Sequence, residues 1–188
     1  MVVKIDMNIL NLDEIIIRRI SDKDVDPLGV FFETVLRHTY IKEDLMSFES
    51  EMLQEIEVKK GYVKDDLSSN GGLRFLLIAE HQGQILGTLS IGAAEENDII
   101  CESAPELSRL YELGTAFIWP EAQHKGIVTK LIEVMRLELI SRGETRFCLD
   151  SGYPTAQKIW TKKFGAPLYH LKDYWGAGSD HMIWEVKL

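Results

Sequence analysis

Hydrophobic residues recur along this chain at two spacings, and each spacing predicts one kind of element. In residues 22–39 and 42–59 the apolar side chains follow the helical period, so we expect two consecutive helices there. A β-branched run at residues 15–20 precedes them and is typical of a strand. We expect the second helix to end before Gly61, because glycine interrupts helical segments.

A pair of strands is predicted next. Residues 74–80 and 84–91 have the composition of strands and flank a short connection that contains Gly83, which is typical of an antiparallel hairpin. Residues 93–110 are rich in acidic side chains and include Pro105. We interpret this segment as an acidic connector to the centre of the chain.

The central segment combines an apolar stretch, a polar turn and a strongly periodic helix. Pro120 closes the apolar stretch at 113–119, residues 123–126 form the turn, and Gly143 is expected to end the helix. The first amides of a helix have no internal partner, and the helix dipole places positive charge there. Gly126 lacks a Cβ, so the backbone can approach a ligand closely. We therefore predict that this turn holds a diphosphate.

Four more elements complete the chain. We expect a strand at 145–150, a helix from Pro154 to Gly165, and two strands at 167–173 and 181–187. The order is β-α-α-β-β-β-α-β-α-β-β, which predicts an α+β fold with a mixed, mostly antiparallel sheet of about six or seven strands and about four helices. We find no repeat or linker in the 188 residues, so we expect one domain.

Composition limits the class of protein. The chain is 45% hydrophobic and 27% charged, as globular domains are, and its net charge of -9 disfavours binding to nucleic acid. Cys101 and Cys148 have no partners at metal-ligand spacing, which suits a reducing compartment. We see no signal-peptide core and no run of transmembrane length, so we expect a cytoplasmic protein without a membrane partner.

Charge is distributed unevenly along the chain. Residues 41–66 and 93–112 are acidic, whereas residues 123–163 are basic. The first two segments would suit a cationic ligand, and the third would suit a polyanion. An ordinary solvated acidic surface explains the first two segments equally well.

Two segments carry a resemblance to a known family. Ile118, Pro120, Gln123 and Gly126 match a turn of the form V-x-P-x-x-(R/Q)-x-x-G-x-(G/A), and residues 156–165 are similar to A-x-x-(L/I)-Y-x-K-x-G-F. With the order of elements around them, the chain resembles the GNAT superfamily of acyl-CoA-dependent N-acyltransferases from about residue 13 to 188. The resemblance implies a GNAT-like fold and acetyl-CoA as co-substrate.

The resemblance also implies where the cofactor lies, which is between the central strand and the helix at 156–165. The residues assigned to it are Phe117, Ile118, Gln123, His124, Lys125, Gly126, Ile127, Val128, Thr129 and Trp160. Two of them depart from the family pattern. Val128 replaces a Gly or Ala, where its side chain could crowd the diphosphate, and Trp160 replaces a Tyr, which removes the usual proton donor.

The chemistry implied is direct transfer of an acetyl group to a primary amine. Glu112 matches the position of the family's base and needs a raised pKa to act, although a solvated carboxylate at a strand end is an equal alternative. A backbone N–H near Phe117 or Ile118 would bind the oxyanion. Tyr153 is our candidate acid, with Tyr169 and Tyr174 as alternatives. No cluster has metal-ligand spacing, so we predict no metal.

The acceptor is the least determined part. Acidic side chains in the segments that hold acceptors in this family favour a small cationic molecule or a peptide amine; these are Glu49, Glu51, Glu55, Glu95, Glu96 and Asp98. Alternatives are a longer acyl donor, from CoA or an acyl carrier protein, and a non-catalytic acyl-CoA-binding module. The final strands, with Tyr174, Trp175 and Trp184 expected on the surface, would allow a homodimer.

Overall fold

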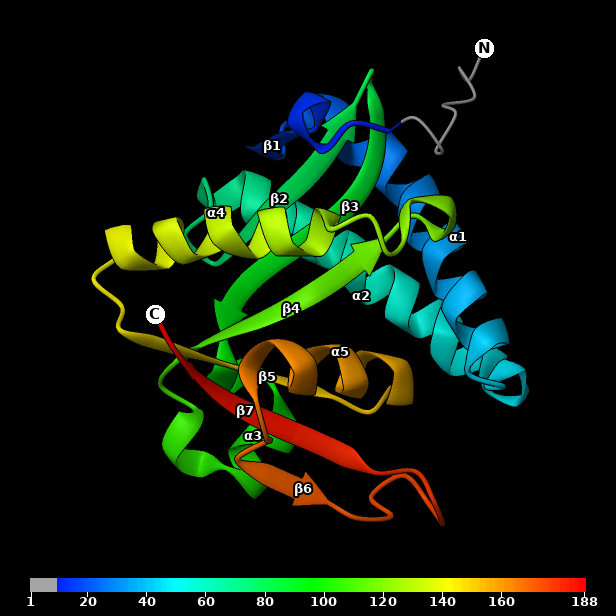
Figure 1. Ribbon diagram of the computed structural model, residues 1–188, viewed down its shortest axis with the longest axis vertical. Coiled ribbons are helices and arrows are strands. Elements are labelled where there is room, and N and C mark those ends of the chain that lie inside the picture. Colours follow the sequence, from blue (N-terminus) through cyan, green and yellow to red (C-terminus); the bar gives the residue numbers. More distant parts are fainter. Residues whose placement is uncertain (1–9) are drawn as a thin grey trace.

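The computed structural model describes residues 10–188, which form a seven-stranded sheet with helices on both faces (Figure 1). The sheet has the order β1-β2-β3-β4-β5-β7-β6, and all neighbours are antiparallel except β4 and β5. Its strands are β1 (Ile16–Arg19), β2 (Arg74–His81), β3 (Gln84–Ala93), β4 (Tyr111–Ile118), β5 (Arg146–Ser151), β6 (Tyr169–Leu171) and β7 (His181–Lys187). The predicted α+β fold with a mixed, mostly antiparallel sheet is confirmed.

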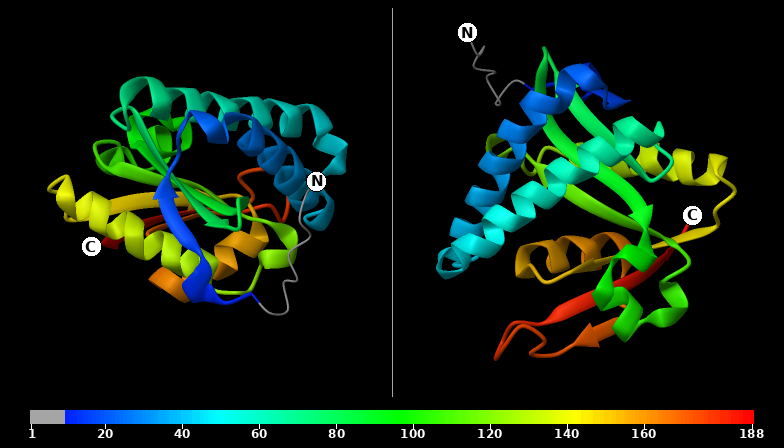
Figure 2. Two further views of the ribbon diagram at one scale, coloured as in Figure 1. Left: turned by 90° about the horizontal axis from the view of Figure 1, so that it is seen from above. Right: turned by 180° about the vertical axis from the view of Figure 1, so that it is seen from behind.

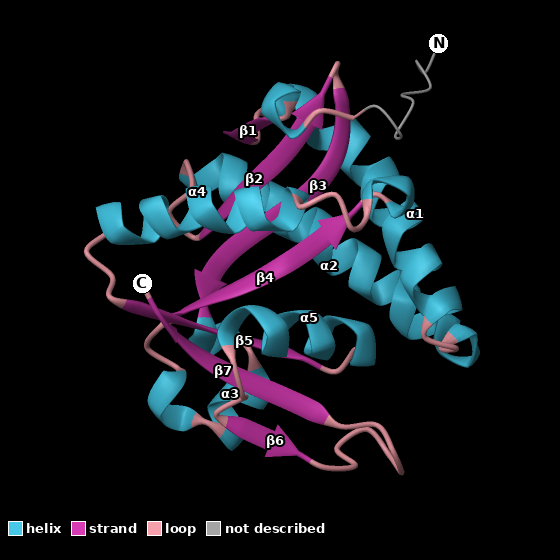
Figure 3. Cartoon of the chain, viewed as in Figure 1, coloured by secondary structure: helices cyan, strands magenta, loops and turns pink. Residues whose placement is uncertain are grey.

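The helices divide between the two faces of the sheet (Figures 2 and 3). They are α1 (Val25–Lys42), α2 (Glu49–Ser69), α3 (Asp98–Ser103), α4 (Ile127–Ser141) and α5 (Pro154–Phe164). Alternate residues of β2 enter different cores because side chains alternate across a strand. Leu76 and Ile78 pack with α1 and α2, whereas Leu77 and Ala79 pack with α4 and α5.

Helix α2 is longer than the sequence predicts. It does not end before Gly61 but continues through it, so that prediction is wrong. Near its C-terminal end the buried carboxylate of Asp66 accepts hydrogen bonds from Arg19 Nη2, over 2.8 Å, and from the amide of Leu76, over 2.7 Å. These bonds attach the last turns to β1 and β2, and they outweigh the weak helix propensity of one glycine.

The acidic connector contains a helix, α3, that the sequence did not predict. Asn97 caps it, because the side-chain oxygen accepts hydrogen bonds from the amides of Ile99 and Ile100 over 3.0 and 3.2 Å. Ile100 is buried in a small core with Cys148 and Ile183. Burial of one apolar residue and a good cap therefore suffice for a short helix in an acidic segment.

Trp184 is not on the surface as we expected but is 1% exposed in the main core. Tyr174 and Trp175 are exposed. Strand β7 lies between β5 and β6 and not at an edge of the sheet, and its Trp184 packs in the main core. Pairing of two copies through the last strands stays a prediction.

The feature that positions the site is the separation of β4 from β5. Their register contains one aligned pair, Glu112 with Cys148, and beyond it the two strands diverge. A β-bulge in β4 follows between Gly114 and Phe117, with Thr115 at a φ of 53°. Thr88 and Ser90 of β3 stabilise it by donating their hydroxyl hydrogens to the Thr115 carbonyl and hydroxyl oxygens, over 2.8 and 2.9 Å.

Candidate active site

Two cavities open beside the diverging ends of β4 and β5. The larger, of about 450 Å³, lies between the end of α1, the turn after β4, and α5. The smaller, of about 200 Å³, lies between α2 and the strands β2, β4 and β5. They share Ala116, Phe117, Tyr153 and Ala156 as lining residues, so a ligand in one cavity can meet a ligand in the other.

The wall of the larger cavity includes the turn into α4. His124 has a φ of 63° and Gly126, the N-cap residue, has a φ of 86°, so the backbone adopts the left-handed conformation twice in three residues. Within residues 10–188, no group accepts a hydrogen bond from the amides of residues 124–128. Consecutive free amides at a helix N-terminus form an anion-binding concavity. This geometry fits the phosphates of a nucleotide cofactor.

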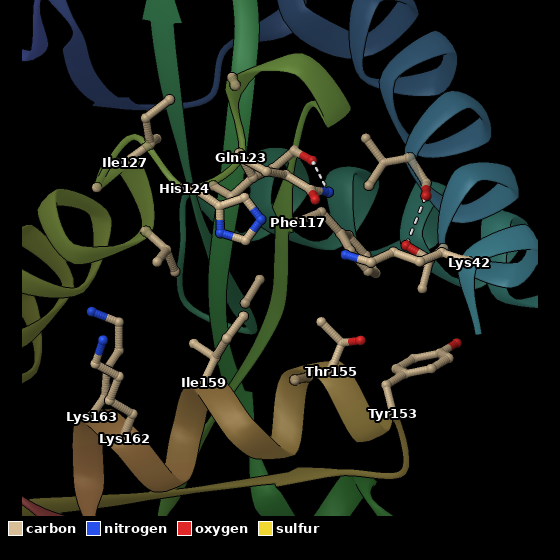
Figure 4. A pocket seen from close by; sticks show the side chains of 18 of the residues that line it. Lys42, Phe117, Gln123, His124, Ile127, Tyr153, Thr155, Ile159, Lys162 and Lys163 are labelled. Carbon is tan, nitrogen blue, oxygen red and sulfur yellow. Dashed lines mark hydrogen bonds between the residues drawn. The ribbon is translucent and has the colours of Figure 1, made fainter.

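Lysines supply formal positive charge on the opposite wall. Lys162 and Lys163, at the C-terminal end of α5, point across the cavity toward the side where His124 lies (Figure 4). Lys163 donates a hydrogen bond to Thr129 Oγ1 over 2.6 Å, which connects α5 to the first turn of α4. Sequence reasoning overlooked both lysines, although they lie within the segment that resembles the family.

The residues that the sequence assigned to the cofactor are mostly brought together. The larger cavity is lined by Phe117, Ile118, Gln123, His124, Gly126, Ile127 and Val128. Lys125 and Thr129 are exposed beside it but do not line it. Val128 packs partly against the main core, so only part of its side chain faces the cavity.

Trp160 lies elsewhere than the resemblance implied. It lines the smaller cavity, stacks on Phe164 with ring centroids 5.8 Å apart, and belongs to the main core. Trp160 therefore does not line the larger cavity, where most of the residues assigned to the cofactor lie.

Glu112 lines the smaller cavity and is paired with Cys148 at the point where β4 joins β5. Burial and, after it, the negative charge of Asp150 raise the pKa of Glu112 to about 7, against a weaker opposite effect of Arg74 and Lys59. A carboxyl group with this pKa is ionised in a large fraction of molecules at neutral pH and can still accept a proton. It has the property that a general base needs.

Asp150 belongs to a hydrogen-bond network that the sequence did not reveal. Its Oδ2 accepts from Asn97 Nδ2 over 3.1 Å and is 2.9 Å from His181 Nε2. His181, the first residue of the last predicted strand, is buried and lines the smaller cavity. The only indication of this hydrogen-bond network in the sequence was that Asp150 ends a predicted strand.

Tyr153 lies where the two cavities meet. Its hydroxyl group donates a hydrogen bond to Glu55 Oε2 over 2.8 Å. Burial, followed by the negative charge of Glu55, raises the pKa of Tyr153 well above its ordinary value. The hydroxyl therefore stays protonated, but it is a weaker acid than a free tyrosine.

Most of the acidic residues proposed to select a cation do not line either cavity. Of the six, Glu55 alone lines the smaller cavity. Glu49 is 3.6 Å from Arg37, and Glu96 is 2.6 Å from Arg74. Arg74 and Lys59, two cations that sequence reasoning did not consider, also line the cavity.

The described residues contain no group of three or more His, Cys, Asp or Glu side chains that could hold a metal ion. None of the helices at residues 10–188 combines the length and apolar character needed to cross a membrane. Cys148 is buried, and burial raises its thiol pKa far above the usual value, so it lacks the character of a nucleophile.

No family model and no curated protein matches this chain by sequence. Its fold, in contrast, is similar to solved structures. A putative acetyltransferase of the GNAT family from Desulfovibrio desulfuricans is 16% identical with a TM-score of 0.67, and the match covers 92% of this chain and 98% of that one. PaiA N-acetyltransferase from Thermoplasma acidophilum, in complex with coenzyme A, is 18% identical with a TM-score of 0.66, over 93% and 99% of the two chains.

A third similar structure is yncA, a putative acetyltransferase from Salmonella typhimurium with its cofactor acetyl-CoA. It is 16% identical with a TM-score of 0.65, over 93% of this chain and 94% of that one. Likenesses at this level of identity show the fold. The chain therefore has the fold of the GNAT N-acetyltransferases, as the resemblance implied.

Proposed function

We propose that this chain, which has the GNAT fold, is an N-acetyltransferase that transfers an acetyl group from acetyl-CoA directly to a primary amine. The observation that carries the proposal is the pair of joined cavities. One has free amides and lysines for an anion, and the other contains a carboxyl group with a pKa of about 7. The fold alone would support any acyl transfer, so the argument rests on these groups.

The larger cavity would hold acetyl-CoA. The free amides of residues 124–128 suit its diphosphate, and Lys162 and Lys163 offset the negative charge. Beyond Glu112 the side of β4 that faces β5 has no strand partner, so its backbone near Phe117 and Ile118 can bond a peptide-like arm.

The smaller cavity would hold the amine. Acetyl-CoA supplies an acetyl thioester, and the C–N bond forms as the C–S bond breaks. Glu112 would take the proton that the attacking amine loses, either directly or through a water molecule. Backbone amides near the β4 bulge are the candidates for stabilising negative charge on the thioester oxygen.

The sulfur that leaves needs a proton, and Tyr153 stays our candidate donor because it lies where the cavities meet. Its hydrogen bond to Glu55 works against this role, because a raised pKa weakens the acid. A proton from water is the alternative, since the larger cavity opens to solvent.

Isothermal titration with acetyl-CoA, followed by thiol release across a panel of primary amines, tests the proposal. We expect binding below millimolar concentration and turnover of at least one amine. Gly126→Asp places a carboxylate beside the phosphates and should abolish binding. No binding to the unaltered protein at millimolar acetyl-CoA would rule the proposal out.

A further inference from the structure

Three residues form a row across the sheet beneath the smaller cavity. Arg74 of β2 pairs with Gly92 of β3, and Gly92 pairs with Glu112 of β4. Side chains at directly paired positions of antiparallel strands point to the same face. Arg74 and Glu112 therefore point to one face of the sheet, with a glycine between them.

Gly92 allows the side chain of Arg74 to lie across the sheet. A Cβ atom at Gly92 would overlap with Cζ and both terminal nitrogen atoms of Arg74, so the guanidinium rests on the Gly92 backbone. This direction brings the guanidinium toward Glu112, and its positive charge acts on that carboxyl group. Any side chain at position 92 would prevent the guanidinium of Arg74 from lying there.

The guanidinium of Arg74 is buried but not fully paired. The side chain is 3% exposed, and Tyr62 covers one face with its ring centroid 3.7 Å from Cζ. Nη2 donates to Glu96 over 2.6 Å, whereas Nε and Nη1 have no acceptor within residues 10–188. In residues 10–188, every side-chain nitrogen or oxygen atom that is fully shut off from solvent has a hydrogen-bond partner. Because Nε and Nη1 have none, these two nitrogens must be accessible, and we infer that the access is through the cavity that Arg74 lines.

Charges of opposite sign lie on the two sides of Glu112. Arg74 and Lys59 are the cations, and Lys59 Nζ lies 5.0 Å from the centre of the Tyr62 ring. Asp150 lies on the other side, in β5. Lys59 Nζ also lies 4.0 Å from Glu55 Oε1, so Arg74 is the cation that a ligand meets on one side of Glu112, with Asp150 on the other side.

We propose that the acceptor is a small zwitterion, a primary amine that also carries a carboxylate, with the amine at Glu112 and the carboxylate on Arg74. The inference rests on the proposed function. The N–H groups of Arg74 that Glu96 leaves free can donate charge-assisted hydrogen bonds to a carboxylate, and Lys59 adds charge without fixing direction. The cavity of about 200 Å³ lies below the usual range for drug-sized ligands, which favours a molecule of the size of an amino acid.

The proposal changes the expected specificity. A purely cationic amine would meet Arg74 and Lys59 as like charges, and a neutral carboxamide would offer the guanidinium one carbonyl oxygen but no negative charge. A site built for a buried polar contact discriminates strongly against an analogue that lacks it. We expect at least a thirtyfold preference for the carboxylate over the matched carboxamide.

The test compares pairs of amines that differ at one group. The α-amino acids, β-alanine and their carboxamides are assayed for thiol release with acetyl-CoA at pH 9, where Glu112 is ionised, and each kcat/KM is referred to the free amine. The members with a carboxylate should be the better substrates. Carboxylic acids without an amine should also inhibit the unaltered protein competitively, and their amides should not.

Variants then assign the preference to a residue. In Arg74→Gln the ratio of kcat/KM between carboxylate and carboxamide should fall to below about 3, and Lys59→Gln should lower it less. Arg109→Gln, on the exposed surface outside both cavities, is the matched control and should retain the full ratio. If Arg74→Gln does not fold, the inhibition experiment on the unaltered protein still tests whether the site binds a carboxylate, because carboxylic acids should inhibit and their amides should not.

Three results overturn the proposal. The first is that carboxamides or diamines are acetylated as well as the amino acids are. The second is that no pair is acetylated while other amines are, and the third is an unchanged ratio in folded Arg74→Gln. Acetyl-CoA binding separates these failures from failure of the proposed function, because the zwitterion proposal can fail while acetyl-CoA binds and carboxylate-free amines are acetylated.

Discussion

The indole N–H of Trp175 donates a hydrogen bond to Nδ1 of His181 over 3.1 Å, and this contact determines the histidine tautomer. Because an indole nitrogen can only donate, Nδ1 must be the acceptor. The proton of the neutral imidazole is therefore on Nε2, which donates to Asp150 over 2.9 Å. With Asn97 as second donor, the Asp150 carboxylate is held in one orientation beside Glu112.

Asp150→Asn should shift the pH profile of the enzyme. The charge of Asp150 raises the pKa of Glu112, so its removal lowers that pKa below about 7. A base acts in its ionised form, and activity is lost as pH falls through its pKa. The acid limb of kcat/KM should therefore move to lower pH by about half a unit or more.

Glu106→Gln is the control for this experiment, because Glu106 is exposed and lies outside both cavities. It should leave the acid limb in place. An acid limb that stays unchanged or moves to higher pH in Asp150→Asn would contradict the assignment of Glu112 as the base.

Glu112→Gln should make the protein inactive and more stable at alkaline pH. The folded-state pKa of about 7 lies above the ordinary 4.5, so the folded state holds the proton more tightly than the unfolded state. The stability this provides is complete below about pH 4.5 and is lost as pH rises through 7. The variant should be more stable than the unaltered protein by on the order of 2 kcal/mol at pH 8.

Thermal unfolding at pH 5 and pH 8 measures this difference, and at pH 5 the two proteins should unfold at similar temperatures. Thiol release should fall at least a hundredfold at pH 8, while acetyl-CoA affinity stays within a factor of about three. Equal stability of the two proteins at both pH values would argue against a buried carboxyl group with a raised pKa at Glu112.

Gly126→Ala and Gly143→Ala separate the cofactor site from helix stability. Both glycines flank α4 with φ near 85°, so a Cβ strains the backbone at either end. Each variant should lose about 1–2 kcal/mol of stability. Only Gly126→Ala should weaken acetyl-CoA, by about tenfold in isothermal titration, because Gly143 lies at the far end of the helix. Equal affinities of the two variants would contradict the phosphate site.

Tyr153→Phe tests the candidate acid. If Tyr153 protonates the leaving sulfur, kcat should fall by about a hundredfold with acetyl-CoA affinity retained. Glu55→Gln removes the charge that raises the pKa of Tyr153, so it should preserve or increase kcat. A kcat of Tyr153→Phe close to that of the unaltered protein would instead assign the hydroxyl to positioning Glu55.

Local pattern was sufficient for much of the fold and for the turn that lines the larger cavity. The turn before α4 is continuous in sequence, and its glycine and helix N-terminus determine its chemistry without help from distant residues. The same holds for the hairpin strands, whose composition and short connection at Gly83 are local properties. Of the residues that the sequence assigned to the cofactor, seven line the larger cavity, and all seven lie between residues 117 and 128.

The set of residues that line the smaller cavity depended on tertiary structure. Arg74, Glu112 and Asp150 come from three strands far apart in sequence, and the register of the sheet decides that they share one cavity. Lys59 joins them from α2, which lies outside the sheet. The sequence by itself determined which groups are available and where an anion can bind. Only the folded sheet determined which charges surround Glu112, because burial and distance set its pKa and neither is a property of local sequence.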